Sequence, residues 1–281
     1  MPDAAVPRRA ARWRFARRWL LFPVAVWLGA VLVMKWLENS LVFQPDRADR
    51  AWVPPPAADV DDVWFTSADG TRLHGWWFPH PGGGAVLVSH GNGGNLSHRG
   101  QLADDLRAAL GRPVLVFDYP GYGKSDGAPS EAGCYAAGDA ALRWLAEDRR
   151  VPPDRVVLLG ESLGGGVAAD LAARTDHEAL VLVKTFTSLP AVAKSIYPWL
   201  PTHTLMSNRF DTLAKLPRCR KPVFIAHGTA DRLIPFAHAE ELFAAANEPK
   251  ELCPLPGLDH NDQLPAEFHA GLKQFLTRIS R

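Results

Sequence analysis

The sequence predicts an α/β fold, in which a mostly parallel sheet has helices on both faces and one transmembrane helix precedes it. From residue 85 onward, short apolar runs alternate with helix-forming segments, the order that produces parallel strands joined by helices. Residues 19–37 form a long apolar stretch ahead of this pattern. A Gly-x-Ser-x-Gly pentapeptide stands between an apolar run and a helix-forming segment, where a sharp turn is expected.

The N-terminal region is interpreted as a basic cytoplasmic tail, residues 1–18, followed by a transmembrane anchor, residues 19–37. The tail carries six arginines and one acid, whereas the rest of the chain has 25 basic and 29 acidic residues. Lys35 is the single charge in the anchor. Trp19 and Trp36 lie near the two ends of the anchor, as interfacial aromatic residues do. A helix of this length spans about 28 Å, enough for a hydrocarbon core.

The arginines ahead of the span predict its orientation. Positive charge stays on the cytoplasmic side, so the N-terminus is expected in the cytoplasm and the body across the membrane. High Arg, Ala and Pro usage suggests a bacterial protein, which makes that compartment the periplasm. Two alternatives remain open: a cleaved signal peptide, although residues 34–40 offer no small-x-small site, and a helix packed on the body.

A linker, residues 38–58, is expected to join the anchor to a single domain at 59–281. Pro54, Pro55 and Pro56 make it a stiff spacer, although its apolar opening at 41–43 could instead dock on the body. Residues 68–71 predict a hairpin turn. The eight expected strands are 60–66, 73–78, 85–89, 113–117, 155–159, 179–183, 222–226 and 250–255. The expected helices are 96–110, 131–147, 163–174, 236–246 and 263–279.

The pentapeptide at 160–164, Gly-Glu-Ser-Leu-Gly, predicts a nucleophile. A strand runs into it and a helix follows, so the turn lifts the Ser162 hydroxyl clear of the sheet. The flanking glycines leave room for such a sharp turn. The helix N-terminus favours negative charge beside the serine. The alternative is a glycine-rich turn with an idle serine.

Asp231 and His260 are the candidate partners of Ser162. A nucleophilic serine needs a base, and the base needs a carboxylate to fix its tautomer. Asp231 follows the strand at 222–226, and His260 follows the last strand. Taken singly, the aspartate is typical of a helix N-cap or turn residue, and the histidine of a solvated or structural one. The order Ser, Asp, His after successive strands favours a catalytic triad.

The chain resembles the α/β-hydrolase superfamily over residues 59–281. The segment 90–95, His-Gly-Asn-Gly-Gly-Asn, is similar to the family's oxyanion loop, and 118–125 to its Asp-x-x-Gly-x-Gly-x-Ser segment. The motif sequences most resemble those of membrane-anchored, single-span hydrolases with a short cap, some of which are esterases or protein-palmitoyl thioesterases. The resemblance implies an oxyanion hole made by the backbone N–H groups of Leu163 and Asn92, with Gly93 as the next candidate.

One residue departs from the family pattern. Lys184 stands where relatives usually carry an acid, which rules out a triad acid at that strand end and strengthens Asp231. A positive charge here would change the charge of the pocket.

Residues 185–216 break the alternation where this superfamily inserts a cap. The segment is rich in proline and aromatics, and an ordinary surface excursion is the alternative. As a small lid it would wall an acyl pocket with Phe186, Tyr197, Trp199, Leu205 and Met206, and Gly93 of the 90–95 segment is also expected to line that pocket. Since about thirty residues cannot enclose the site, an open pocket suits a bulky or membrane-presented acyl donor.

The sequence therefore predicts a serine hydrolase of carboxylic esters or thioesters, acting on a small-molecule or lipid-like acyl substrate. A serine peptidase or acyltransferase on the same triad is one alternative, and a non-catalytic membrane-anchored binding protein is another. The acidic body excludes binding of nucleic acid by charge. No metal or cofactor is implied, because the chain has no His-Glu-x-x-His or paired-cysteine motif.

Overall fold

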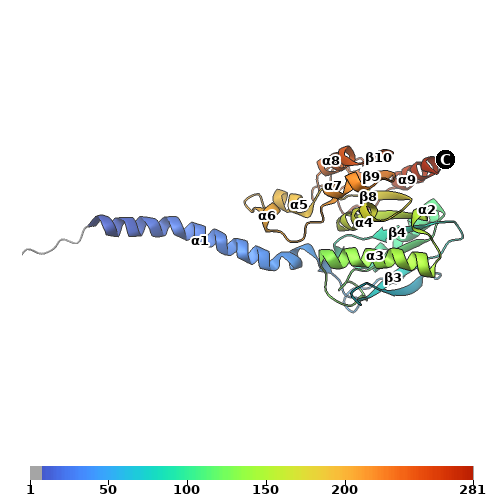
Figure 1. The fold of residues 1–281 in the computed structure, drawn as a ribbon, viewed down its shortest axis with the longest axis horizontal. Coiled ribbons are helices and arrows are strands. Elements are labelled where there is room, and N and C mark those ends of the chain that lie inside the picture. The colour runs from blue at the N-terminus through green and yellow to red at the C-terminus, as the bar shows by residue number, and fades with distance from the viewer. Residues whose placement is uncertain (1–7, 281) are drawn as a thin grey trace, which may run out of the picture.

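The computed structural model describes residues 8–280, with side-chain surroundings from Leu21 onward. The start of the predicted arginine-rich tail, residues 1–7, and the side chain of Trp19 lie outside this part. A long helix, α1 (Arg8–Val42), projects from one end of a layered body (Figure 1). Within it, Leu21–Val42 is long and apolar enough to cross a membrane.

The body is built on an eight-stranded sheet, as predicted. The strand order is β10-β9-β8-β7-β4-β6-β3-β2, and the pairs from β10 to β6 are parallel while β2 and β3 add an antiparallel edge. The central strands are buried, which explains their unbroken apolar runs. The strands are β2 (Asp61–Thr66), β3 (Arg72–Phe78), β4 (Ala85–Ser89), β6 (Val114–Phe117), β7 (Val156–Glu161), β8 (Ala179–Val183), β9 (Val223–Gly228) and β10 (Lys250–Leu255).

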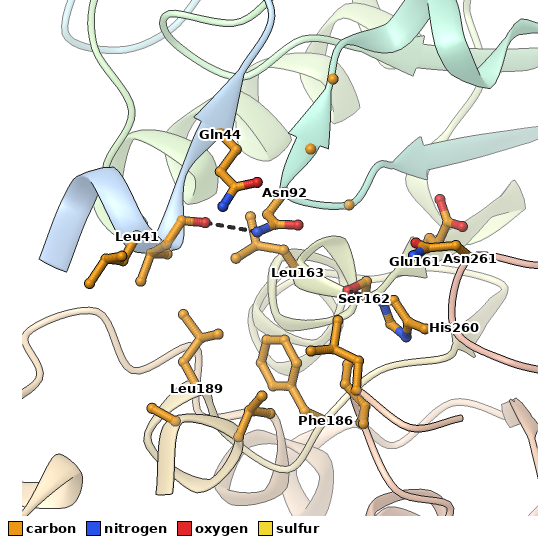
Figure 2. Close-up of a pocket in the computed structure, with 18 of the residues that line it drawn as sticks. Leu41, Gln44, Asn92, Glu161, Ser162, Leu163, Phe186, Leu189, His260 and Asn261 are labelled. Atoms are coloured by element: carbon orange, nitrogen blue, oxygen red, sulfur yellow. Dashed lines mark hydrogen bonds between the residues drawn. The ribbon is translucent and has the colours of Figure 1, made fainter. Parts of the chain in front are cut away.

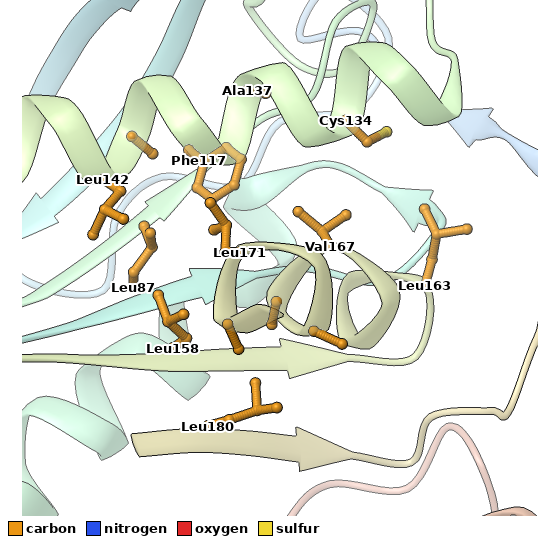
Figure 3. Close-up of a cluster of buried hydrophobic side chains, with 14 of the residues drawn as sticks. Leu87, Phe117, Cys134, Ala137, Leu142, Leu158, Leu163, Val167, Leu171 and Leu180 are labelled. Carbon is orange, nitrogen blue, oxygen red and sulfur yellow. The ribbon is translucent and has the colours of Figure 1, made fainter. Parts of the chain in front are cut away.

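Helices cover both faces of the sheet and form two apolar cores. On one face α3 and α4 pack together over the strands, and Figure 3 shows Val167 and Leu171 of α4 between α3 and the sheet residues Leu158 and Leu180. On the other face α2 and α9 bury a second cluster around Phe224. The helices of the body outside the cap are α2 (Gly100–Leu110), α3 (Glu131–Asp148), α4 (Leu163–Arg174), α8 (Ala237–Ala245) and α9 (Ala266–Ile279), with 3₁₀ turns η1 (Leu96–Arg99) and η2 (Pro153–Arg155).

The segment between β8 and β9 forms a small cap. It contains α5 (Leu189–Ile196), α6 (Thr202–Leu205), α7 (Thr212–Lys215) and the 3₁₀ turn η3 (Leu216–Arg218). Ser188 and Asp211 cap the N-termini of α5 and α7 through their side chains. The cap lies at the end of the body from which α1 projects (Figure 1).

The expected linker at 38–58 is not a free spacer. Helix α1 continues through Val42, and β1 (Gln44–Pro45) then pairs in parallel with β5 (Gly93–Gly94). Phe43 is buried, and the backbone N–H of Val53 donates to Ser97 Oγ at 3.0 Å. The alternative, in which the apolar opening of this segment docks on the body, describes the structure. Burial of Phe43 and the main-chain pairing hold the segment against the body.

The end of α1 is also bonded to the cap. Lys35 Nζ donates to the carbonyl of Leu205 at 2.7 Å and to Ser207 Oγ. Glu38 Oε1 accepts the backbone N–H groups of Ser207 and Asn208, both at 2.7 Å. Lys35 and Glu38 pair with each other at 2.7 Å. Lys35, the single charge of the predicted anchor, thus binds the cap in the structure.

The turn between β7 and α4 has no room for side chains at its glycines. A Cβ on Gly164 would overlap the carbonyl of Ser89, and one on Gly160 would overlap the backbone at Gly164. Backbone cannot yield as the end of a flexible side chain can. Glycine is therefore required at both places on steric grounds.

We expect Gly164→Ala to lower the melting temperature of the full chain in detergent by about 3–10 °C, since overpacking against backbone costs about 1–3 kcal/mol. Gly93→Ala is the matched control, because a Cβ there meets nothing within 4 Å. Thermal unfolding of both variants provides the test. Equal melting temperatures for the two would contradict the steric account.

Candidate active site

Ser162 occupies a strained backbone conformation between β7 and α4. Its φ is +52° and its ψ is −117°, a region that L-residues rarely adopt. Its N–H donates to the carbonyl of Val183 at 2.9 Å, and Thr185 Oγ1 donates to its carbonyl at 2.7 Å. These bonds hold the turn from both sides. The hydroxyl consequently stands at the N-terminus of α4, where free N–H groups favour negative charge.

Ser162, His260 and Asp231 form one chain of hydrogen bonds. Ser162 Oγ lies 3.1 Å from His260 Nε2, and His260 Nδ1 lies 2.8 Å from Asp231 Oδ2. The three residues come from the ends of β7, β10 and β9, which meet at the carboxyl edge of the sheet. The structure therefore brings together the three residues that the sequence singles out.

Asp231 is held as a carboxylate. Its Oδ1 accepts the backbone N–H groups of Leu233 at 3.0 Å and Ile234 at 2.7 Å. Burial opposes the charge, but hydrogen bonds from His227, His260 and Ile234 lower the pKa of Asp231 well below its usual range. The group thus stays ionised around neutral pH, as required to stabilise a protonated His260.

Lys184 bonds to the loop that carries His260. It is buried and has a φ of +47°, and its Nζ donates to the carbonyl of His260 at 3.1 Å and to that of Asp262. Burial lowers the pKa of Lys184, opposed by the charges of Glu161 and Asp231. The residue is not among those that line the cavity, and both of its side-chain hydrogen bonds go to the His260 loop.

The loop after β4 carries the candidate oxyanion donors. The carbonyl of Asn92 accepts from Tyr122 Oη at 2.8 Å, and its side-chain Nδ2 donates to the carbonyl of Val42 at 3.0 Å (Figure 2). Asp118, fully buried, accepts the N–H of Leu96 at 2.8 Å and fixes the far end of the loop. The N–H of Leu163 belongs to the first turn of α4, where it has no intrahelical partner.

A cavity of about 880 Å³ opens above Ser162. In Figure 2, Phe186 and Leu189 of the cap face Asn92 and the end of α1 across this space. Of the predicted pocket residues, Gly93, Phe186, Tyr197, Leu205 and Met206 line the cavity. The prediction for Trp199 is wrong: it is not among the lining residues, and 49% of its surface is exposed beyond the end of α5.

Sequence reasoning missed one wall of the cavity. Helix α1 contributes Val31, Met34, Leu41 and Val42, and the cap adds apolar side chains from α5. The spacing of the α1 residues would have shown a common helical face, but nothing in an apolar stretch separates lipid-facing from pocket-facing positions. Among the described residues, no cluster of His, Cys, Asp or Glu could hold a metal ion.

The fold and the site define an α/β-type hydrolase, and the comparisons agree. The family model for the alpha/beta hydrolase fold matches residues 84–204. "Alpha/beta hydrolase domain-containing protein WAV2" of Arabidopsis thaliana is 30% identical over 77% of this chain and 73% of its own. The chain therefore belongs to the α/β-hydrolase superfamily.

Bacterial relatives and solved structures extend the likeness over most of the chain. Rv2307c of Mycobacterium tuberculosis is 40% identical over 85% of this chain and 86% of its own. YfhR of Escherichia coli is 33% identical over 86% and 87%. The Pyrococcus furiosus esterase Pf2001 shares the fold with a TM-score of 0.70 and 21% identity, covering 84% of this chain and 97% of its own.

Asp231→Asn should lower kcat by about 10³- to 10⁴-fold, because an amide NH₂ facing His260 Nδ1 forces the wrong tautomer. The side-chain carbonyl can still accept from Leu233 and Ile234, so the fold should be preserved. Turnover of an activated ester together with circular dichroism gives the readout. Near wild-type turnover in a folded Asp231→Asn protein would remove Asp231 from the site.

Lys184→Met should lower kcat/KM by about 10- to 100-fold through displacement of the His260 loop. Its melting temperature should change little, because removing a buried amine also removes its desolvation penalty. Lys221→Met is the control, since Lys221 pairs with Asp176 at the surface. If both variants kept wild-type kcat/KM, Lys184 would have no part in positioning His260.

Proposed function

We propose that this protein is a membrane-anchored serine hydrolase that cleaves carboxylic esters or thioesters through an acyl-enzyme intermediate. The observation that carries the proposal is the hydrogen-bonded chain Ser162–His260–Asp231, whose Ser162 and His260 line a cavity together with apolar side chains of α1 and the cap. The solved esterase that shares the fold supports it.

In the proposed first step, Ser162 Oγ attacks the acyl carbonyl while His260 Nε2 accepts the hydroxyl proton. His260 then protonates the departing alcohol or thiol, leaving an ester on Ser162. In the second step His260 removes a proton from water, which attacks this ester; His260 then returns the proton to Ser162 Oγ as the acid leaves. Asp231 keeps the Nδ1 proton on His260 and stabilises the imidazolium in both steps.

The tetrahedral intermediates place negative charge on the former carbonyl oxygen. The N–H groups of Leu163 and Asn92 are the proposed donors to it, with Gly93 next to them. Removing one such donor costs about 10²- to 10³-fold in kcat in other hydrolases. Because both donors belong to the backbone, their placement depends on the turn at Ser162 and on the bonds that fix Asn92.

For α1 we propose an uncleaved transmembrane anchor with the N-terminus in the cytoplasm and the hydrolase domain in the periplasm. Arginines precede the apolar stretch, and the stretch meets the length that a span requires. The bonds of Lys35 and Glu38 to the cap support retention of the helix, since cleavage would leave their partners unpaired.

The full chain in detergent should hydrolyse p-nitrophenyl esters, with chain-length preference reporting the size of the cavity. Ser162→Ala should lower kcat about 10³-fold or more, because the nucleophile is lost while binding remains. Release of p-nitrophenol gives the rate, and acyl chains from two to sixteen carbons form the series.

A fluorophosphonate probe separates the alternatives. Labelling of Ser162 without ester turnover would favour a peptidase or an acyltransferase on the same triad. Failure of both labelling and turnover, with Ser162→Ala indistinguishable from the wild type, would contradict the proposed hydrolase and leave a binding protein.

A further inference from the structure

We infer that the last turns of α1 form part of the acyl-binding wall, and that the substrate is a long-chain acyl ester or thioester embedded in the membrane. Its acyl chain would enter the cavity between α1 and the cap directly from the bilayer. This inference rests on the proposed function, since it assigns the substrate class of the same site.

One face of α1 lines the cavity. Its residues recur at the spacing of a helix face: Val31, Met34, Lys35, Glu38, Leu41 and Val42. The stretch from Val31 to Val42 rises about 16 Å, so this wall is as long as a substantial part of an acyl chain. Residues between these positions point elsewhere, and Leu32 and Trp36 are 69% and 83% exposed.

The same helix is the candidate membrane span. The apolar stretch Leu21–Val42 contains every one of the lining positions on α1. Exposed neighbours such as Leu32 and Val33 are apolar and suit contact with lipid. Consequently one side of this helix segment faces lipid while the other faces the cavity, and the cavity reaches to the membrane surface.

The cap supplies the opposite wall and its own apolar surface. Leu189, Val192 and Ile196 of α5 line the cavity, with Leu205 and Met206 beside them. Ile196 and Trp199 are each 49% exposed on this small cap. Figure 1 shows α5 and α6 on the side of the body from which α1 projects, where a membrane crossed by α1 would lie. A half-exposed tryptophan there is typical of an interfacial residue.

Polar bonds keep these two walls together. Lys35 and Glu38 bind Leu205, Ser207 and Asn208 of the cap, and Asn92 Nδ2 binds the carbonyl of Val42. The membrane helix is thus joined to both the cap and the oxyanion loop. Because the body cannot move away from the bilayer without breaking these bonds, the cavity stays at the membrane surface.

The arrangement of polarity in the cavity matches a lipid. In Figure 2, Ser162 and His260 lie on one side of the cavity, and Leu41 of α1 and Leu189 of α5 lie on the other. Charged residues such as Lys35, Glu38 and Arg99 also line the cavity, and a lipid likewise joins an apolar chain to polar groups. An ester group at the end of a long apolar chain has the same division. A route from the bilayer also spares such a chain the free-energy cost of passing through water, which grows with each methylene.

The test uses the full chain in phosphatidylcholine vesicles and two substrates. One is 4-methylumbelliferyl palmitate dissolved in the bilayer, and the other is p-nitrophenyl butyrate supplied from water. Met34→Trp narrows the α1 wall, and Leu32→Trp places the same side chain on the exposed face of the same helix. Met34→Phe is a milder second variant, and fluorophosphonate labelling of Ser162 verifies a folded site in each.

We expect Met34→Trp to lower the ratio of palmitate to butyrate turnover about tenfold, and Met34→Phe to lower the ratio less. The larger side chain would block the binding of the palmitoyl chain along α1. Leu32→Trp should leave the ratio at its wild-type value. An unchanged ratio in both Met34 variants, or an equal fall in Leu32→Trp, would overturn the inference. Absence of Ser162-dependent turnover of both substrates would instead contradict the proposed function.

Discussion

The sharp turn between β7 and α4 is the constraint on which the rest of the site depends. Ser162 has a positive φ, and glycine at 160 and 164 allows the backbone to pass within contact of Ser89. The strain is borne because β7 lies at the centre of the sheet and α4 is buried between α3 and the strands. This single turn places the serine hydroxyl beside His260 and also the Leu163 N–H group at the start of α4.

The remaining parts of the site are fixed by bonds to backbone groups. Lys184 holds the carbonyls of the His260 loop, Leu233 and Ile234 donate to Asp231, and Tyr122 donates to the carbonyl of Asn92. The end of α1 joins this network through Asn92 and through the cap, so helix α1 and the candidate site are connected by hydrogen bonds.

Much of this architecture can be predicted from the sequence because its signals are local. Apolar runs give the strands, and the carboxyl ends of parallel strands meet at one edge, so Ser162, Asp231 and His260 are expected together. Trp199 and Lys184 could not be placed in this way, since the direction of a cap side chain and the partner of a buried lysine depend on tertiary packing. The sequence does not show that Met34 lines the cavity, because an apolar helix face can contact either lipid or protein. The proline-rich spacer likewise gave no sign that β1 pairs with β5.

The central claim is that Ser162, activated by His260, forms a covalent acyl intermediate. The most direct measurement is peptide mass spectrometry of the full chain after reaction with a p-nitrophenyl carbamate, whose serine adduct is hydrolysed slowly. The account predicts a carbamoyl group on Ser162 in the wild-type protein and its loss in His260→Ala, because the hydroxyl then lacks its base. An adduct on another residue, or equal modification of Ser162 in His260→Ala, would contradict it.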